Sequence, residues 1–294
     1  WCLASRLLAM GAGGPYIRRM NMFQDVDALA ARVPDGALVA LPPEYSWISM
    51  AFIRALIARE ARDLHILCVP IGGIGVDMLV GAGCVGTLEA AAVSLGEAGL
   101  APRFTEAIQS GAIKMLDSTC PAIHTGLQAS EKGVPFMPLS GLIGSDIEKF
   151  RDDWKVVDDP LENGGGPIAL IPAIRPDFAV FHSPKADREG NVWIGKRREL
   201  ATMAHAARET LVTVEDIVDD DFPADDTLAA GTLSNLYIGG VAEAANGAWP
   251  SALPGSYDAD TDEIAAYARA AKTTDGFQDY LARILGDVHS DAAE

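Results

Sequence analysis

Apolar runs and amphipathic stretches alternate through most of the chain. Runs of mainly apolar residues, bounded by turn-forming residues, predict buried strands at residues 37–41, 64–69, 112–116, 178–182 and 211–214. Apolar residues that recur at helical spacing predict helices at residues 48–56, 76–80, 103–110, 121–131 and 196–208, with two more at 262–272 and 277–285. This alternation favours an α/β fold: an open, largely parallel sheet with helices on both faces.

Weaker patterns fill the middle of the chain. Short strands are predicted at residues 136–139, 168–171 and 192–194, and in the second half of 88–95. The polar segment 152–166 ends in three glycines and is interpreted as a surface excursion. In open parallel sheets, ligands bind at the carboxyl ends of the strands, so the loops that follow them are where we expect a site.

The first residues do not fit this pattern. Residues 1–22 contain an apolar stretch too short for a signal peptide, and Met10, Met20 and Met22 are all plausible start positions. We therefore expect residues 1–22 to be a leader that is disordered or not native. Residues 23–294 are expected to form a single α/β domain that ends in two helices.

Charge narrows the range of partners. The formal net charge is −18 and the isoelectric point is about 4.6. Such a surface repels phosphates and anionic lipids, which argues against nucleic acid or a membrane as a partner. The four cysteines lack zinc-site and disulfide spacing, and no apolar run reaches the roughly 18–20 residues of a membrane span. We expect a soluble, cytoplasmic protein with reduced thiols and no metal.

Two glycine motifs resemble phosphate-binding loops, but the residues in and around them do not fit such loops. Residues 81–86 match G-x-G-x-x-G, but the preceding segment is helix-like, whereas the dinucleotide fingerprint needs a strand there. Residues 190–197 nearly match the P-loop, but Arg197 replaces the Ser or Thr, and a β run occupies the middle of the motif. We therefore expect residues 81–86 to be a helix end followed by a tight turn. The second motif, residues 190–197, does not support a nucleotide triphosphatase.

Two possible nucleophiles are weak candidates. Cys120 and His124 stand four residues apart on a predicted helix, although buried structural thiols are far commoner than catalytic ones. Glu162 lies on a glycine-rich turn, where a carboxylate can attack a thioester, but the surrounding Asp and Gly residues favour a plain surface turn.

Taken together, several stretches resemble the A (alpha) subunit of the class I coenzyme A transferase family, and in particular the A subunit of glutaconate CoA-transferase. The segments that carry the resemblance are 76–85, 110–113, 126–129, 133–138, 175–182, 187–192, 210–217 and 247–250, followed by Tyr257. Each is weakly specific, but their order and spacing are fairly specific, and they run from about residue 33 to residue 285.

The resemblance implies a three-layer fold of the NagB/RpiA type and a B-type partner, in an A2B2 or similar assembly. It implies transfer of CoA between an acyl-CoA and a small carboxylic acid, with CoA as co-substrate and no tightly bound cofactor. In this family the group that attacks the thioester is a Glu of the B subunit. No catalytic residue is therefore expected in this chain, and it is expected to be inactive alone.

The resemblance also indicates site loops. Gly72 and Gly73 match one site loop; Ser94, Leu95 and Gly96 match the next. Ser94 is interpreted either as a substrate contact or as a plain strand-end cap.

The first loop departs from the family pattern. Residues 41–47 lack the usual glycines, so Glu44, Tyr45 and Trp47 are candidate pocket lining. Cys120 stands where related steroid ring-opening hydrolases carry a carboxylate, with Asp117 nearby.

Four functions therefore remain open. The first is the A subunit of a transferase. The second is a CoA-thioester hydrolase or ring-opening lyase on the same fold, for which Ser94, Cys120 and Asp117 are the weak catalytic candidates. The third is a non-catalytic structural subunit, and the fourth is a dinucleotide-binding oxidoreductase that rests on residues 81–86 alone. The sequence does not name the acyl group.

Overall fold

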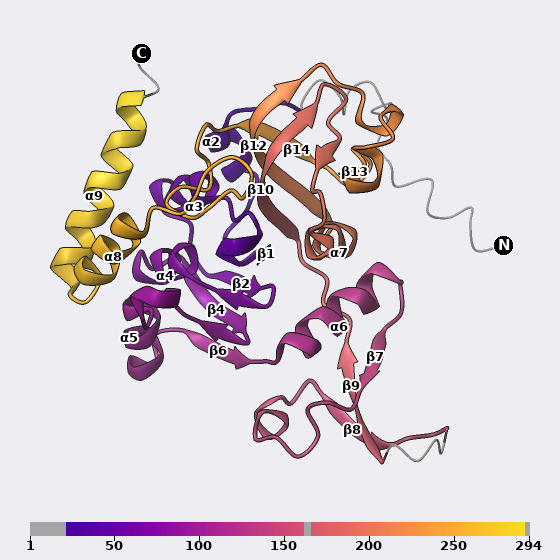
Figure 1. The fold of residues 1–294 in the computed structure, drawn as a ribbon. Helices are drawn as coiled ribbons and strands as arrows, with labels where there is room; N and C mark the ends of the chain where they lie inside the picture. Colours follow the sequence, from indigo (N-terminus) through magenta and orange to yellow (C-terminus); the bar gives the residue numbers. More distant parts are fainter. Residues whose placement is uncertain (1–21, 162–165, 292–294) are drawn as a thin grey trace.

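A mostly parallel sheet forms the centre of the computed structural model, which describes residues 22–161 and 166–291. Its parallel strands lie in the order β14-β12-β10-β1-β2-β4-β6 (Figure 1). Their bounds are β1 (Leu38–Leu41), β2 (Leu64–Cys68), β4 (Val85–Ala90), β6 (Lys114–Asp117), β10 (Phe178–Asp187), β12 (Glu209–Val218) and β14 (Gly240–Glu243). Two antiparallel strands, β11 (Val192–Trp193) and β13 (Thr232–Leu233), extend it beyond β10.

Side chains alternate between the two faces of this sheet, as strand geometry requires. In β1, Val39 and Leu41 pack into one core, and Ala40 packs into the other. Where both faces of a strand are buried, as along β1, the strand is a continuous apolar run, and its position could be predicted for that reason.

Helices cover both faces (Figure 1). On one face lie α2 (Val26–Ala30), α3 (Met50–Ala58), α4 (Ile74–Gly81), α5 (Pro102–Ser110), α8 (Thr261–Ala270) and α9 (Thr274–Asp291). On the other lie α6 (Cys120–Glu131) and α7 (Arg198–Ala206). The predicted three-layer α/β fold with helices on both faces is confirmed.

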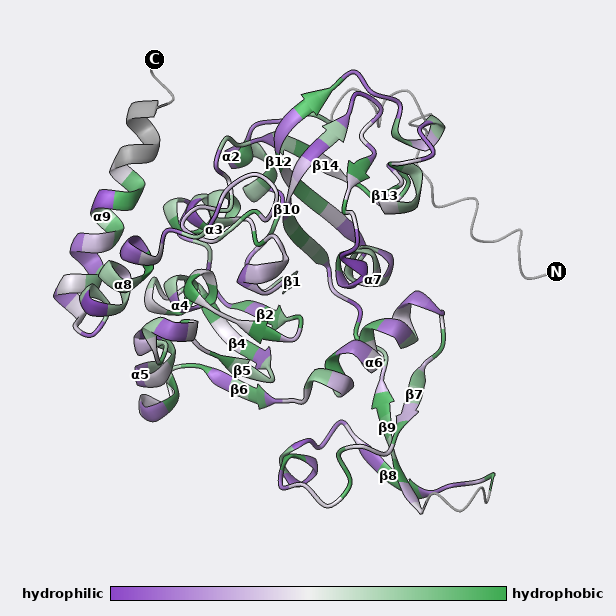
Figure 2. Cartoon of the chain, in the orientation of Figure 1, coloured by the Kyte–Doolittle hydropathy of each residue, from purple (hydrophilic) through white to green (hydrophobic). Residues whose placement is uncertain are grey.

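A smaller antiparallel sheet projects from the body beside α6 (Figure 1). Its order is β7-β9-β8, with β7 (Phe136–Leu139), β8 (Lys155–Asp158) and β9 (Pro167–Pro172). Figure 2 shows apolar residues in these strands, and Ala122, Leu142, Trp154, Ala169 and Ile171 form its own small core. Residues 152–166, interpreted as a surface excursion, are mostly exposed where the structure describes them, but they contain the strand β8, which was not predicted and which pairs with β9.

Other boundaries also differ from expectation. The strand expected in the second half of residues 88–95 lies earlier, as β4, and only the two-residue β5 (Ala92–Val93) follows it. Strand β5 pairs with the equally short β3 (Ile71–Gly72), which was not predicted. Short 3-10 turns occupy Glu44–Ser46, Gly96–Ala98, Ile147–Phe150, Phe222–Ala224 and Ala229–Gly231. The leader prediction and the Glu162 turn concern residues that, apart from Met22, lie outside the described ranges.

Capping residues define several helix ends. Ser49 caps α3 by accepting a hydrogen bond from the Phe52 N–H at 3.2 Å, and Thr119 caps α6 by accepting one from the Ala122 N–H at 3.2 Å. Gly111 ends α5 with φ +71°, a left-handed conformation that favours glycine. Each cap fixes where the adjoining loop begins.

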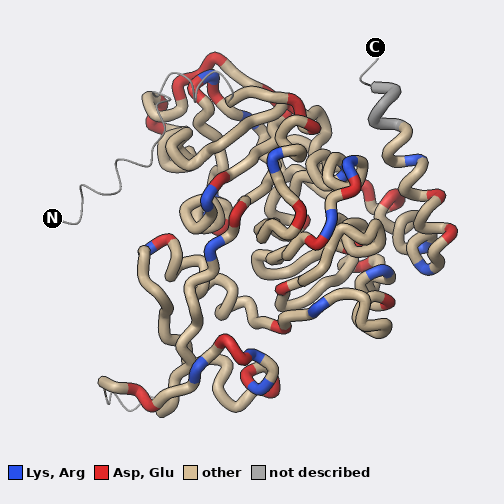
Figure 3. The backbone as a smooth tube through the Cα atoms, turned by 180° about the vertical axis from the view of Figure 1, so that it is seen from behind, with Lys and Arg blue, Asp and Glu red and all other residues tan. Residues whose placement is uncertain are grey.

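Acidic residues occur along both the body and the projecting sheet (Figure 3). Within the described ranges, no helix is both long enough and apolar enough to cross a membrane.

Candidate functional site

Strands β1, β2, β4 and β6 run parallel, so their carboxyl ends share one edge of the sheet. The loops that lead away from this edge contain the residues of the predicted site loops. In an open parallel sheet, this edge is where ligands bind.

Two of the predicted site loops lie against each other. Strand β3 pairs with β5, and the Ser94 N–H donates to the Gly72 carbonyl at 3.0 Å. A Cβ at Gly72 would come within 2.9 Å of Cys68 Sγ, so the close approach requires glycine. The Ser94 hydroxyl accepts from the Gly96 N–H at 3.1 Å and donates to the Gly99 carbonyl at 3.4 Å, and it therefore caps its own turn. Ser94 and Gly96 are exposed, whereas Leu95 is buried.

Glu44 lies over the glycine turn that follows β2. A Cβ placed on Gly73, which is the N-cap of α4, would overlap the Glu44 carboxyl. The Oε1 atom is buried and has no hydrogen-bond partner within the described part of the chain. Burial raises the pKa of Glu44 to about 7, although its own backbone N–H and those of Gly75 and Gly73 act in the opposite direction. The carboxyl therefore changes its protonation state around neutral pH.

Trp47, the other buried candidate from the first loop, is only 1% exposed. Its φ is +67°, its ring centroid lies 5.8 Å from that of Trp193, and the Arg197 guanidinium lies 4.0 Å from the same centroid. Its carbonyl accepts a hydrogen bond from the His182 N–H at 2.7 Å. Trp47 therefore anchors the first loop in the core. Tyr45, the third candidate from this loop, is exposed.

Cys120, at the position of the hydrolase carboxylate, and the nearby Asp117 are both exposed. Asp117 is the last residue of β6, and Cys120 is the first residue of α6. Burial lowers the pKa of His124, one turn further along α6. No hydrogen bond joins Cys120 to His124 among the described residues, so the proposed thiol–imidazole pair stays a prediction.

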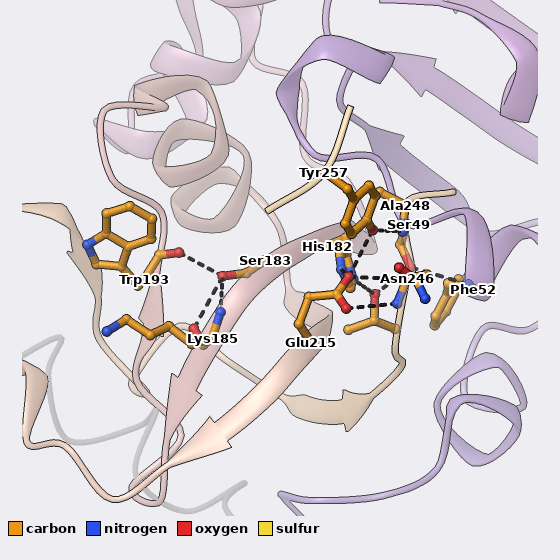
Figure 4. A network of polar contacts seen from close by, with 12 residues as sticks. Ser49, Phe52, His182, Ser183, Lys185, Trp193, Glu215, Asn246, Ala248 and Tyr257 are labelled. Carbon is orange, nitrogen blue, oxygen red and sulfur yellow. Dashed lines mark hydrogen bonds and ion pairs between the residues drawn. The ribbon is translucent and has the colours of Figure 1, made fainter. Parts of the chain in front are cut away.

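A buried polar network, which the sequence did not reveal, lies next to the first loop (Figure 4). His182 of β10 is fully buried; its Nδ1 is 2.8 Å from Thr213 Oγ1 and its Nε2 is 2.7 Å from Glu215 Oε1. The Ser49 hydroxyl is 2.6 Å from the Thr213 hydroxyl. The network thus joins the start of α3 to the two central strands β10 and β12.

The Glu215 carboxylate accepts several of the hydrogen bonds in this network. Besides His182, the Tyr257 hydroxyl donates to it at 2.8 Å, and the Asn246 and Gly247 N–H groups donate at 2.7 and 3.2 Å. Burial raises the pKa of Glu215, but these donors outweigh it and hold the pKa below the usual value of 4.5. An ionised Glu215 therefore ties the loop after β14 to β12.

Figure 4 also shows a separate contact beside this network. The Ser183 hydroxyl donates to the Trp193 carbonyl at 2.7 Å. The contact ties β10 to β11 and so supports the ring that stacks near Trp47.

A second buried ionic group lies at the ends of β4 and β6. Arg151 donates to Glu89 and to the Asp117 carbonyl at 2.8 and 3.1 Å, and two of its nitrogens each lie 2.8 Å from an Asp153 oxygen. Glu89, Arg151 and Asp153 line a cavity of about 110 Å³ together with Ser118, whose buried hydroxyl has no partner within the described ranges.

A larger groove of about 540 Å³ lies at the opposite edge, where the strands begin. It is lined by Arg32, Asp177, Arg208 and Glu209, among others. Because ligands in this type of sheet bind at the carboxyl edge, the groove is not the predicted site.

The glycine motifs are now explained by the fold. Gly81 ends α4, Gly83 has φ +72° in the turn, and Gly86 lies in β4. This helix–turn–strand order is the reverse of a dinucleotide fingerprint, as expected. Residues 192 and 193 form β11, so the P-loop match also fails on structure. Among the described residues, no cluster of three His, Cys, Asp or Glu side chains suits a metal ion.

Comparisons with known proteins agree with this architecture. The sequence pattern of the coenzyme A transferase family matches residues 23–230. The chain belongs to this family. It is 29% identical over 262 residues to the A subunit of 3-oxoadipate CoA-transferase from Pseudomonas knackmussii, covering 87% of this chain and 90% of that protein. It is 30% identical over 250 residues to the cholesterol ring-cleaving hydrolase IpdA subunit of Rhodococcus jostii, covering 82% and 84%.

The fold is shared with a solved structure. The crystal structure of glutaconate coenzyme A-transferase from Acidaminococcus fermentans superposes with a TM-score of 0.82 at 24% identity, covering 90% of this chain and 89% of that one. Together with the family match, this confirms the predicted resemblance to the A subunits of CoA-transferases. The family's co-substrate is CoA, whereas the roles expected for Gly72, Gly73, Ser94 and the other site residues stay predictions.

Proposed function

We propose that this chain is the A subunit of a heteromeric CoA-transferase, which moves CoA between an acyl-CoA and a small carboxylic acid. The observation that carries the proposal is the family match over residues 23–230, combined with site loops that meet at the carboxyl edge. Relatives that are themselves named as A subunits support a B-type partner, and we propose an A2B2 arrangement without a tightly bound cofactor.

The chemistry assigned to the partner is nucleophilic. A Glu carboxylate on the B-type partner attacks the thioester carbonyl, the CoA thiolate leaves, and a mixed anhydride forms. The thiolate then attacks the glutamyl carbonyl, which releases the acyl group as a carboxylate and leaves a glutamyl–CoA thioester. The second acid reverses these steps. This chain supplies the loops around Gly72 and Ser94, which hold the acyl group close to that Glu.

Intact-mass spectrometry tests the proposal. The chain, co-purified with its B-type partner, is incubated with a panel of acyl-CoAs and then with borohydride. We expect a mass change on the partner that matches reduction of a glutamyl–CoA thioester and that is absent without acyl-CoA. A complex that leaves both chains unchanged and releases no CoA would overturn it for the acyl-CoAs in the panel.

A hydrolase is the second candidate, because a ring-cleaving hydrolase subunit is among the 30% identical relatives. Free CoA released without any mass change on either chain would favour it. Asp117, Cys120 and Ser94 would then be the first residues to replace. Cys120 stands at the position of the expected carboxylate, and this argues for the transferase.

A further inference from the structure

The first loop of this chain carries a carboxyl group at the place where the family is expected to have glycines. Glu44 follows β1, and its carboxyl lies directly over Gly73, at the carboxyl end of β2. Gly72 and Ser94 adjoin the same turn through the β3–β5 pairing. The carboxyl therefore borders the position proposed for the acyl group.

No counter-ion faces Glu44 within the described part of the chain. The titratable groups that interact with Glu44 are the buried Cys68 of β2 and the neighbouring Tyr45. Tyr45 in turn interacts with Cys120 and with Glu199 of α7, which accepts a hydrogen bond from Ser46. None of these is a cation, and Arg197 lies over the Trp47 ring. Burial is the largest influence on the pKa of Glu44 and raises it to about 7.

The geometry also leaves the carboxyl without a complete set of partners. Oε1 is sealed from solvent and accepts no hydrogen bond within the described ranges, although the residue as a whole keeps part of its surface. A buried carboxylate that lacked partners would carry a large desolvation penalty, which protonation removes. A neutral carboxylic acid, in turn, has an O–H to donate.

We propose that Glu44, in its neutral form, donates a hydrogen bond to the thioester carbonyl oxygen of an acyl-CoA bound at the Gly72–Gly73 turn. This oxygen becomes negative when the partner's carboxylate attacks, and a donor already in place stabilises that charge without reorganisation. The role deepens the proposed function and rests on it. It also explains how this chain manages without the expected glycine loop, whose backbone would approach the ligand instead.

Infrared spectroscopy of the thioester carbonyl tests this proposal. An acyl-CoA from the panel, labelled with carbon-13 at the thioester carbonyl, is bound to the complex, and its infrared band is recorded at pH 6 and pH 8.5. In the wild type, we expect a band shifted to lower frequency at pH 6 that returns towards its free position at pH 8.5. Glu44→Gln keeps an N–H donor and should show the shift at both pH values, whereas Glu44→Ala should show it at neither.

Rates supply a second readout. We expect kcat/KM of Glu44→Ala to fall about 100-fold, in line with loss of one oxyanion donor. The wild-type rate should fall as pH rises through about 7, and the rate of Glu44→Gln should not. Glu60→Gln, an exposed Glu-to-Gln change just beyond the far end of α3, is the matched control and should behave like the wild type.

The two proposals fail in different ways. A partner adduct together with the same band position in the wild type and Glu44→Ala overturns the role of Glu44 and leaves the transferase intact. A shifted band that depends on Glu44, without any partner adduct, overturns the transferase and leaves the role of Glu44. A complex that binds none of the panel overturns both.

Discussion

Replacing Glu215 with Gln would test how firmly the buried network holds the loops beside the site. The Glu215 side chain is 16% exposed and accepts four hydrogen bonds, from His182, Tyr257 and the N–H groups of Asn246 and Gly247. Gln offers one acceptor oxygen and adds an NH2 group that faces donors. Hydrogen bonds to a charged group contribute about 1.5–3 kcal/mol, and a buried donor left unpaired costs about 1–3 kcal/mol. We therefore expect Glu215→Gln to lower the free energy of unfolding by about 2–4 kcal/mol at pH 7.

The sign of the pH dependence follows from the pKa. Because the folded-state pKa of Glu215 lies below its usual value of 4.5, the carboxylate contributes stability that is present above about pH 4.5 and is lost as pH falls through the folded-state pKa. The gap between wild type and Glu215→Gln should therefore be widest near pH 7 and shrink below pH 4.5.

Urea unfolding, followed by circular dichroism at several pH values, measures both effects. A loss of this size corresponds to a melting temperature lower by roughly 3–7 °C for a chain of this length. Asp226→Asn, at an exposed position, serves as the control and should change the free energy by less than about 0.5 kcal/mol. A Glu215→Gln protein within about 0.5 kcal/mol of the wild type at pH 7, or a gap that widens in acid, would refute the reasoning.

Three further changes are informative. Gly247→Ala would place a Cβ 2.5 Å from His182 Cε1, and we expect a loss of about 1–3 kcal/mol, measured by urea unfolding. Tyr267→Phe would remove the hydroxyl that donates to the buried Asp77 carboxyl at 2.6 Å; calorimetry should show a loss of about 1–3 kcal/mol. Cys120 is exposed, so peptide mapping should find it alkylated by iodoacetamide in the folded protein, while Cys68 and Cys84 react only after unfolding.

The fold could be predicted largely because its central strands are buried on both faces. Apolar runs such as residues 64–69 and 211–214 are visible in the sequence for that reason. The second half of β10 escaped prediction, since it contains polar residues that are held in the sheet by pairing with β12, as in Lys185 opposite Asp216. The strand β14 is short and begins with glycine, and only its pairing with β12 defines it.

The site could be predicted only in part. The resemblance supplied Gly72 and Ser94, but their contact depends on two strands of two residues each, which no periodicity reveals. The buried network depends on His182 and Thr213, which are polar residues in the apolar runs 178–182 and 211–214 and are register partners in the sheet. The sequence does show one polar residue in each of these two apolar runs. That they face each other in a network could be inferred only after the order of the strands in the sheet was known.

The first loop also limits how the site can adapt to a substrate. Trp47 is held by its carbonyl, which accepts from His182, and by its ring, which contacts Arg197. Ser46 is held by its hydrogen bond to Glu199. These contacts fix the loop directly after Glu44, whose carboxyl lies over Gly73. A substrate carboxylate placed at this turn would meet the carboxyl of Glu44 instead of glycine N–H groups, and would be repelled whenever Glu44 is ionised. Above about pH 7, where Glu44 is ionised, a free carboxylate of the bound acyl group is therefore expected to point away from the turn, whereas at lower pH the neutral carboxyl accepts either kind of oxygen as a partner.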